Sequence, residues 1–213
     1  SEMCIRDSPK TIDNDLKATD MTFGFQTAII TATEAIDKLH TTAESHHRAM
    51  IVETMGRYVG WIALQSGIAG GADVILIPEI PFRIEKVVEK IKERNKRGSK
   101  FSIIVVAEGA KPEGGDVTLL SPADKELGQE RLGGIGNKVA NQITKLTGIE
   151  TRVTVLGHLQ RGGAPCPFDR ILGSRFGSSS VDLAAQGGFG RMVCLKTPHI
   201  KSIPIRDAVS SFK

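Results

Sequence analysis

The sequence has few aromatic residues, few cysteines and no long apolar run. Phe, Trp and Tyr make up 5% of its 213 residues, which is little for a surface that stacks nucleic-acid bases. Cys4, Cys166 and Cys194 are odd in number and too widely spaced for a zinc site. They predict free thiols and a reducing, cytoplasmic location. No apolar stretch reaches the roughly 20 residues that a membrane span needs, so we expect no membrane partner.

Charge is spread along the chain without a long basic block. The 28 Lys and Arg residues exceed the 24 Asp and Glu residues by four. Scattered basic residues suit a small anionic ligand better than a nucleic acid. The densest charged stretch, 85–100, mixes signs at helical spacing, which is typical of a solvated helix face. A hydrophobic content of 40% is enough for a core in one or two compact lobes.

Short apolar runs alternate with helical patterns along the sequence. The spacing of apolar residues and the flanking Gly and Pro residues predict helices at 23–40, 59–69, 84–97, 130–146 and 168–185. The apolar runs predict strands at 49–52, 74–77, 101–107, 151–156 and 192–195. Strands that are apolar throughout indicate a parallel sheet with helices on both faces, which is an α/β fold in three αβα layers.

Two carboxylates stand two residues apart near the beginning of the chain. Asp13 and Asp15 lie in residues 9–15 (PKTIDND), beside the Thr11 hydroxyl and the Asn14 amide. In an extended segment, residues i and i+2 point the same way. Two adjacent carboxylates are unfavourable unless a cation or a proton lies between them. The pair therefore suits removal of a proton from a hydroxyl beside a metal, and an Asx-rich turn is the alternative interpretation.

Three further polar segments follow predicted strands. They are residues 55–58 (MGRY), which we expect to open a helix, 107–109 (AEG) and 157–163 (GHLQRGG). Ligands of parallel sheets bind beyond the carboxyl ends of the strands. We therefore expect these segments to converge on one binding site.

These segments resemble, in the same order, the signature motifs of the 6-phosphofructokinases. The similarity covers residues 9 to about 208 and is greatest to a bacterial group that contains both ATP-dependent and pyrophosphate-dependent enzymes. It implies the phosphofructokinase fold. It also implies transfer of a phosphoryl group from ATP to the 1-hydroxyl of fructose 6-phosphate, which gives fructose 1,6-bisphosphate in glycolysis. A general sugar-binding module would have no need for both Asp13 and Asp15.

The resemblance implies catalytic roles for three residues of the first motif. Asp13 matches the general base, and Thr11 matches a hydroxyl at the substrate or at the transferring group. Asp15 matches a second carboxylate, which we place at Mg²⁺ or in support of the base. Lys10 could contact a terminal phosphate of the donor. Lysine at this position occurs in pyrophosphate-dependent members and in some ATP-dependent ones, so we favour ATP and keep pyrophosphate as the alternative.

The resemblance also implies a binding site for fructose 6-phosphate. The sugar contacts match Thr11, Ile12, Asp13, Met55, Gly56, Arg57 and Glu108. The 6-phosphate clamp matches Arg48, Arg152, His158 and Arg161, of which Arg48 and Arg152 reach in from a neighbouring subunit of a homodimer or homotetramer. The structural alternatives are a turn glycine at Gly56, an ion-pair partner at Glu108 and a structural histidine at His158.

The sequence departs from the family at its beginning. The family's N-terminal half, with its glycine-rich donor loop, has no counterpart here, and residues 1–8 lack the apolar strand that leads into TIDND. We expect residues 1–8 to be foreign sequence, 26–159 to form the lobe that binds fructose 6-phosphate, and 9–25 with 160–213 to be the remnant of the donor-binding lobe. A truncated fragment that binds sugar phosphate without turnover is the second functional hypothesis.

Overall fold

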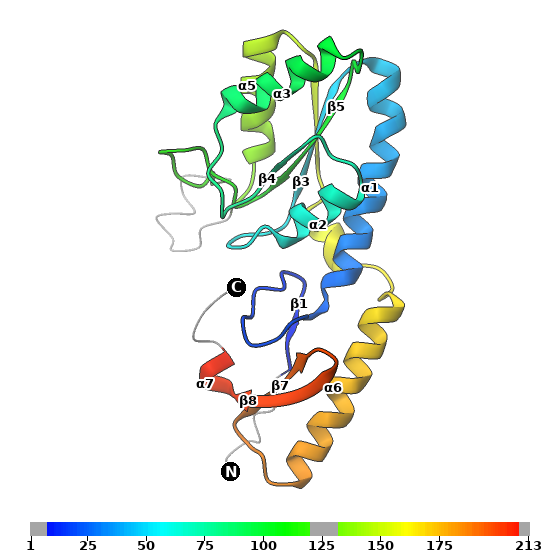
Figure 1. Cartoon of the computed structure of the whole chain (residues 1–213), viewed down its shortest axis with the longest axis vertical. Helices are drawn as coiled ribbons and strands as arrows, with labels where there is room; N and C mark the ends of the chain where they lie inside the picture. Colours follow the sequence, from blue (N-terminus) through cyan, green and yellow to red (C-terminus); the bar gives the residue numbers. More distant parts are fainter. Residues whose placement is uncertain (1–7, 120–131, 209–213) are drawn as a thin grey trace. The chain divides into compact units, whose positions relative to one another are not determined.

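A computed structural model of the chain describes residues 8–119 and 132–208. It divides into two compact units, which Figure 1 shows in sequence colours. Unit 1 contains the residues up to Ala28 and those from Gly163 onward, and unit 2 contains Ile29–Gly162. The segment 1–8, which we expect to be foreign, lies outside the described residues except for Ser8. The assignment of lobes to sugar and donor binding stays a prediction.

Unit 2 is built on a four-stranded parallel sheet in the order β4-β5-β3-β6. The strands are β3 (Ala49–Thr54), β4 (Val74–Leu76), β5 (Ser102–Ala107) and β6 (Thr151–Val155). Ala49 pairs with both Ser102 and Thr151, so β3, β5 and β6 begin in register. All residues of β3 and β5 are buried, as expected for strands covered on both faces. The expected α/β fold with a parallel sheet is confirmed.

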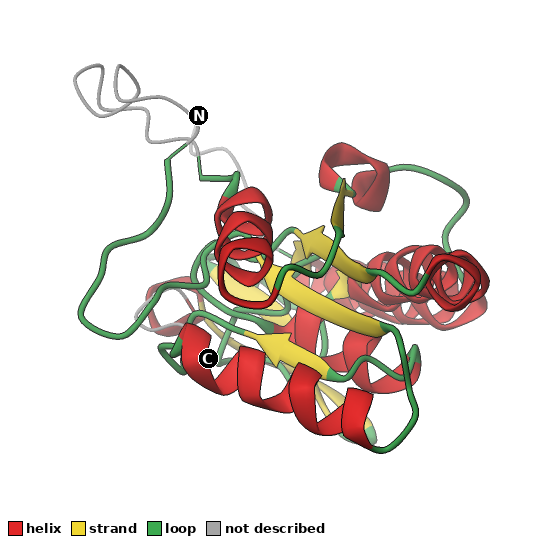
Figure 2. Cartoon of the chain, turned by 90° about the horizontal axis from the view of Figure 1, so that it is seen from above, coloured by secondary structure: helices red, strands yellow, loops and turns green. Residues whose placement is uncertain are grey.

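Helices cover both faces of this sheet (Figures 1 and 2). On one face, α3 (Ile84–Lys96) and α5 (Ile135–Thr147) bury Ile91 and Val139 against Ile51 and Ile104 of the central strands. On the other face lie α1 (Phe25–His46), which begins in unit 1, and α2 (Trp61–Ala69). A Cβ atom on Gly67 of α2 would lie 2.8 Å from the Ile75 side chain of β4, so this helix rests closely on the sheet. The three αβα layers are therefore present.

Two helix boundaries differ from the sequence prediction. The helix expected at 130–146 begins only at Ile135 among the described residues. Gly133 and Gly134 have φ angles of +146° and +80°, which are incompatible with a right-handed helix. Helix α1 extends to His46 instead of residue 40. Its last turns remain anchored because Ala43 is fully buried.

Unit 1 combines short parallel strands, an antiparallel hairpin and helix α6 (Pro167–Ala185). Strands β1 (Lys10–Thr11) and β2 (Phe23–Gly24) pair in parallel, and β7 (Arg191–Lys196) pairs antiparallel with β8 (His199–Pro204), which is followed by α7 (Ile205–Ala208). Residues 192–195, which the sequence groups with the strands of a parallel sheet, pair antiparallel instead. Strand β8 was not expected because its two isoleucines, Ile200 and Ile203, are separated by Lys201 and Ser202 and form no apolar run. The two-residue link between β7 and β8 excludes a helical crossover and requires antiparallel pairing.

The hairpin holds the segment that follows the TIDND motif. The Thr19 hydroxyl donates to the Met21 carbonyl and accepts a hydrogen bond from the Leu195 N–H, both at 2.9 Å. The Phe23 ring lies 6.0 Å from the Phe176 ring of α6. These contacts bury the segment against β7 and α6 and so fix one end of the loop that carries Asp13. None of the described helices combines the length and hydropathy needed to cross a membrane.

Candidate active site

The TIDND loop of unit 1 is held by Asn14. This residue is 5% exposed and has a φ angle of +51°, a left-handed conformation that asparagine tolerates better than most residues. Its Oδ1 atom accepts a hydrogen bond from the Thr22 N–H at 3.0 Å, and the Thr22 hydroxyl donates to the Thr11 carbonyl at 2.8 Å. The loop is thus tied at its centre to the strand that follows it.

The two carboxylates of the motif flank this buried asparagine. Asp13 and Asp15 are both partly exposed, and the Asp13 N–H donates to the Thr11 hydroxyl at 3.2 Å. Ile12 is partly buried beside Gly24, and Lys10 is exposed on β1. The Asn14 side chain binds the backbone of Thr22, eight residues further on, so this bond is not a local Asx turn. That Asp13 and Asp15 face one site stays a prediction.

The MGR segment forms a loop and does not open a helix. Strand β3 ends at Thr54 and α2 begins at Trp61, so the expected placement of Gly56 and Arg57 at a helix N-terminus is wrong. Gly56 has a φ angle of +139°, and a Cβ atom there would lie 2.7 Å from the Val59 carbonyl oxygen. Glycine is therefore required for the tight loop between strand and helix.

Glu108 joins this loop to the end of β5. Its Oε1 atom lies 3.4 Å from the Gly56 nitrogen, and its own N–H donates to the Thr54 carbonyl at 2.9 Å. The Gly109 N–H donates to the Gly56 carbonyl at 3.1 Å. A Cβ atom on Gly109 would lie only 2.1 Å from the Arg57 carbonyl oxygen. The ends of β3 and β5 are therefore bound side by side through their backbones.

A short 3₁₀ helix, η1 (Gly157–Arg161), presents the third motif after β6. Side chains at i and i+3 eclipse in such a helix, so His158 and Arg161 project from the same side, and both are exposed or partly exposed. Gln160 is 1% exposed, and its Oε1 atom accepts a hydrogen bond from the Met55 N–H at 2.8 Å. Three strand ends of unit 2 are thus brought together, as the topology predicts.

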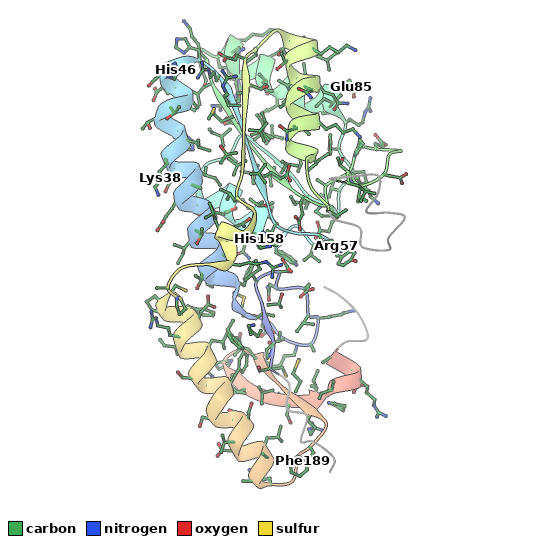
Figure 3. The ribbon with its side chains drawn as sticks, turned by 180° about the vertical axis from the view of Figure 1, so that it is seen from behind. Lys38, His46, Arg57, Glu85, His158 and Phe189 are labelled. Carbon is green, nitrogen blue, oxygen red and sulfur yellow. The ribbon has the colours of Figure 1, made fainter. Side chains whose placement is uncertain are left out.

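Arg48 and Arg152 lie at the opposite end of this sheet, where strands β3 and β6 begin. Glu150 accepts a hydrogen bond from Arg48 Nε at 2.8 Å and forms an ion pair with Arg152. The hydrogen bond from Arg48, with the charges of Arg152 and Arg48, holds the pKa of Glu150 below its usual range. The length of β3 separates the two ends of the sheet by about 17 Å. In Figure 3, His46 lies at one end of unit 2 and Arg57 and His158 lie at the other.

Asp15 is the residue predicted to hold a metal. No group of three or more His, Cys, Asp or Glu side chains within residues 8–119 and 132–208 is placed to form a complete metal site. Mg²⁺ commonly binds through one or two protein carboxylates, with water and substrate phosphates completing its shell. The partly exposed Asp15, next to the anchored Asn14, fits a Mg²⁺ site to which the protein supplies only one or two carboxylates.

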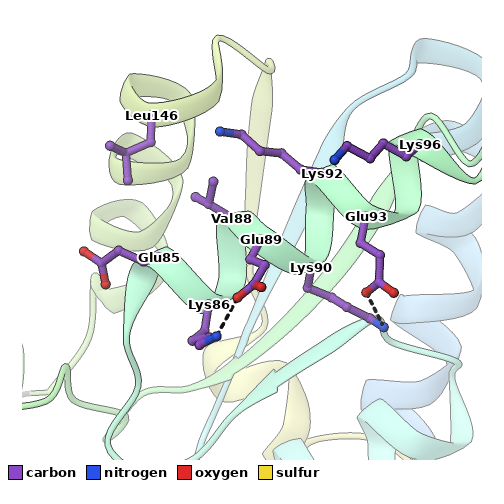
Figure 4. Close-up of a pocket in the computed structure, with 9 residues that line it drawn as sticks. All are labelled: Glu85, Lys86, Val88, Glu89, Lys90, Lys92, Glu93, Lys96 and Leu146. Carbon is purple, nitrogen blue, oxygen red and sulfur yellow. Dashed lines mark hydrogen bonds and ion pairs between the residues drawn. The ribbon is translucent and has the colours of Figure 1, made fainter.

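A groove of about 830 Å³ lies away from these motifs, along the outer face of α3 with Leu146 of α5 at its edge (Figure 4). Its charged groups pair with one another: Lys86 Nζ lies 2.6 Å from Glu89 and Lys90 Nζ lies 3.5 Å from Glu93. The hydrogen bond from Lys86 lowers the pKa of Glu89. This surface is the solvated, mixed-charge helix face that the sequence predicts.

Sequence reasoning missed three residues that organise the motifs. Asn14 and Gln160 lie inside quoted motifs, and only their burial shows that they bind the backbone. Glu53 is 2% exposed at the end of β3, where its carboxylate accepts the Gly134 N–H at 3.1 Å and the Gly136 N–H at 2.8 Å. The one available signal for Glu53 was a charged residue inside an otherwise apolar strand.

The fold and motifs define an α/β protein whose polar residues gather at the carboxyl ends of parallel strands. Comparison with known proteins is more specific. Residues 3–184 match the model of the phosphofructokinase family, and the chain belongs to that family.

Curated relatives carry both donor names. The chain is 58% identical to an ATP-dependent 6-phosphofructokinase of Chloroflexus aurantiacus, over 94% of this chain and 54% of that protein. It is 56% identical to a pyrophosphate–fructose 6-phosphate 1-phosphotransferase of Amycolatopsis mediterranei, over 96% of this chain and 60% of that protein. The chain therefore spans little more than half the length of these relatives.

The fold is also similar to that of solved structures. Phosphofructokinase from Saccharomyces cerevisiae superposes with a TM-score of 0.80 and 33% identity, over 94% of this chain and 26% of that chain. The structural likeness agrees with the family assignment and with the expected phosphofructokinase-like architecture.

Proposed function

We propose that the protein transfers a phosphoryl group from ATP to the 1-hydroxyl of fructose 6-phosphate. The observation that supports this most directly is the joining of three motif segments at the strand ends of unit 2. Met55 is bonded to Gln160, and Gly56 lies against Glu108. Because the chain spans only part of its relatives' length, the complete reaction is proposed for the protein to which this chain corresponds.

Unit 2 would bind the sugar phosphate. His158 and Arg161 share one side of η1, where an arginine fork can pair with two phosphate oxygens. Met55, Gly56, Arg57 and Glu108 of this unit would contact the sugar, and the resemblance assigns further sugar contacts to Thr11, Ile12 and Asp13. Glu108 offers carboxylate oxygens as acceptors for sugar hydroxyls.

Asp13 would take the proton from the attacking hydroxyl. General base catalysis contributes about 10²–10⁴ in rate, which is roughly 3–5 kcal/mol of barrier. Asp15 would hold Mg²⁺, which supplies neutralisation of charge on the phosphates of the donor. The anchoring of Asn14 to Thr22 favours a rigid loop, and rigid placement of reacting groups is the main protein contribution to phosphoryl transfer.

Arg48 and Arg152 would complete the phosphate clamp of a second copy of the chain. Their position at the end of the unit 2 sheet where the strands begin separates them from His158 and Arg161 of the same chain. That separation supports a homodimer or homotetramer with shared sites. The free thiols of Cys166 and Cys194 agree with the proposed cytoplasmic location.

ATP remains the favoured donor and pyrophosphate the alternative. Relatives at 58% and 56% identity carry the two different donor names, so identity does not separate them. Lys10 is exposed on β1 and would be available to a terminal phosphate of either donor.

A coupled assay with Mg²⁺ tests the proposal, with fructose 6-phosphate as acceptor and with ATP and pyrophosphate offered separately. It is run on the 213-residue chain and on a full-length relative, alongside a fructose 6-phosphate titration of the chain. Turnover with one donor supports the proposal and identifies the donor. Binding by the chain without turnover, together with an active full-length protein, supports the fragment hypothesis. Absence of both binding and turnover in the two proteins contradicts the proposal.

A further inference from the structure

We infer that Gln160 is a positioning residue, which fixes the Met55–Gly56–Arg57 loop on the η1 turn and so sets the distance between sugar contacts and phosphate contacts. This inference rests on the proposed function, because it concerns the same binding site. No role follows for Gln160 from the motif alone, in which His158 and Arg161 are the obvious ligands.

The side-chain amide is fixed in one orientation. Gln160 Oε1 accepts the Met55 N–H at 2.8 Å, and the side chain is 1% exposed. A flipped amide would place Nε2 against this N–H donor, so the hydrogen bond determines which atom is oxygen. The bond therefore joins two specific atoms of the turn and the loop.

The turn is attached to β3 and to the loop that follows it. At its beginning, the Leu156 N–H donates to the Glu53 carbonyl of β3 at 3.0 Å. Near its end, Gln160 binds Met55, the first residue after β3. The next residue, Gly56, is held near Glu108. Without the Gln160 bond, the turn would keep its first attachment and lose the one closest to the sugar loop.

The buried amide is not explained by stability alone. Gln160 Nε2 has no hydrogen-bond partner within the described part of the chain, and neither has the buried Thr54 Oγ1 beside the loop. A buried polar atom without a partner costs about 1–3 kcal/mol. An apolar side chain of similar length at position 160 would avoid the Nε2 cost but could not hold the Met55 N–H. The specific gain from glutamine is the placement of the loop.

Two substitutions separate positioning from folding. Gln160→Met keeps the length and burial of the side chain but provides only a weak thioether acceptor. Gln160→Glu restores an oxygen at the same reach. Leu159→Ala, at a neighbouring position that is 70% exposed, is the control for a change in the same turn.

The probes are inorganic phosphate and fructose 6-phosphate, titrated into the ¹⁵N-labelled 213-residue chain and followed by NMR. For Gln160→Met we expect about tenfold weaker binding of fructose 6-phosphate, because the hydrogen bond to the Met55 N–H is lost. Phosphate binding should stay within twofold of that of the original chain. Hydrogen exchange at the Met55 amide should accelerate at least tenfold. Gln160→Glu should recover most of the sugar-phosphate affinity, and Leu159→Ala should change neither ligand.

Equal weakening of both ligands by Gln160→Met would overturn the inference, because the residue would then serve only to fold the turn. Unchanged exchange at Met55 would also overturn it. If the original chain binds no fructose 6-phosphate, the proposed function fails for this chain, and the Met55 exchange rates of the variants alone decide whether Gln160 positions the loop.

Discussion

Glu150 contacts both arginines for which we propose a phosphate-binding role. Its carboxylate contacts both Arg48 and Arg152 at the end of the unit 2 sheet where the strands begin. Exposed ion pairs contribute little to stability, so the value of this arrangement lies in holding two guanidinium groups together. A phosphate bound there would compete with Glu150 for the same donors.

The depressed pKa of Glu150 leads to a testable pH dependence. The hydrogen bond from Arg48 is the main cause of the shift, so the ion pair is fully formed above the usual glutamate pKa of about 4.3 and is lost as the pH falls through the lower, folded-state pKa. Carboxyl ¹³C NMR should show Glu150 titrating below the usual glutamate pKa, and Arg48→Gln should move the pKa of Glu150 upward. An unchanged pKa in Arg48→Gln would contradict this cause.

The two described cysteines differ in their surroundings. Cys194 is fully buried on β7, and desolvation raises the pKa of its thiol. Cys166 is partly exposed at the beginning of α6. Because alkylation requires an accessible thiolate, iodoacetamide at pH 8 should modify Cys166 at least tenfold faster than Cys194. Peptide mapping by mass spectrometry measures both rates, and equal rates in the folded chain would show that Cys194 is not protected.

At the scale of secondary-structure elements, the end of β3 connects most of the site. Glu53 lies under the beginning of α5, Thr54 accepts the Glu108 N–H, Met55 binds Gln160 and Gly56 lies near Glu108. Glu53 and Thr54 of β3, and Met55 directly after it, thus reach α5, β5 and η1 in turn. Alternation of side chains and exposed backbone groups at a strand end makes this possible.

The contact between Glu53 and α5 can be tested by mutation. Its carboxylate accepts hydrogen bonds from the buried Gly136 N–H and the partly buried Gly134 N–H at a helix N-terminus, where negative charge is favourable. We expect Glu53→Ala to lower the free energy of unfolding by about 2–4 kcal/mol, and Glu53→Gln to lower it by about half as much. Urea denaturation provides the measurement. The exposed Glu85→Ala is the control, with an expected change within about 0.5 kcal/mol, and a Glu53→Ala effect that small would remove the assigned role.

At the scale of the whole molecule, the motif segments are divided between two compact units. Unit 1 carries the TIDND loop, and unit 2 carries the motif segments that follow β3, β5 and β6. Each unit has its own buried cluster: Phe176 with Val193 in unit 1, and Ile51 with Val139 in unit 2. Binding and proton removal are therefore assigned to residues with separate structural support.

This division predicts that binding and turnover can be separated by one substitution. Asp13→Ser in a full-length protein that contains this sequence should lower kcat by at least 10², as expected for loss of a general base. Fructose 6-phosphate affinity should change by less than about threefold, because the sugar-phosphate motifs of unit 2 are untouched. Steady-state kinetics and calorimetry provide the two measurements. Retention of the original kcat would contradict the assignment of Asp13 as the base.

Much of the parallel sheet could be predicted from the sequence. Residues 49–54 and 102–107 are apolar or buried throughout, and a short apolar run between helices has few alternatives to a covered parallel strand. The hairpin of β7 and β8 could not be predicted in the same way. Strand β8 has no apolar run, and its order comes from pairing with β7, which a local pattern does not reveal.

The sequence by itself determined which chemical groups are present and which family motifs they resemble: Asp13 and Asp15 in one loop, and His158 with Arg161 three residues apart. Side-chain chemistry and local spacing are properties of the chain, so they can be read directly. Only the tertiary structure decided that Gln160 binds Met55 and that Glu53 binds α5. It also decided that Arg48 and Arg152 lie at the end of the sheet opposite to His158 and Arg161. These contacts join residues about 80–105 positions apart in sequence, and burial and strand register, which bring them together, arise only when the whole sheet is assembled.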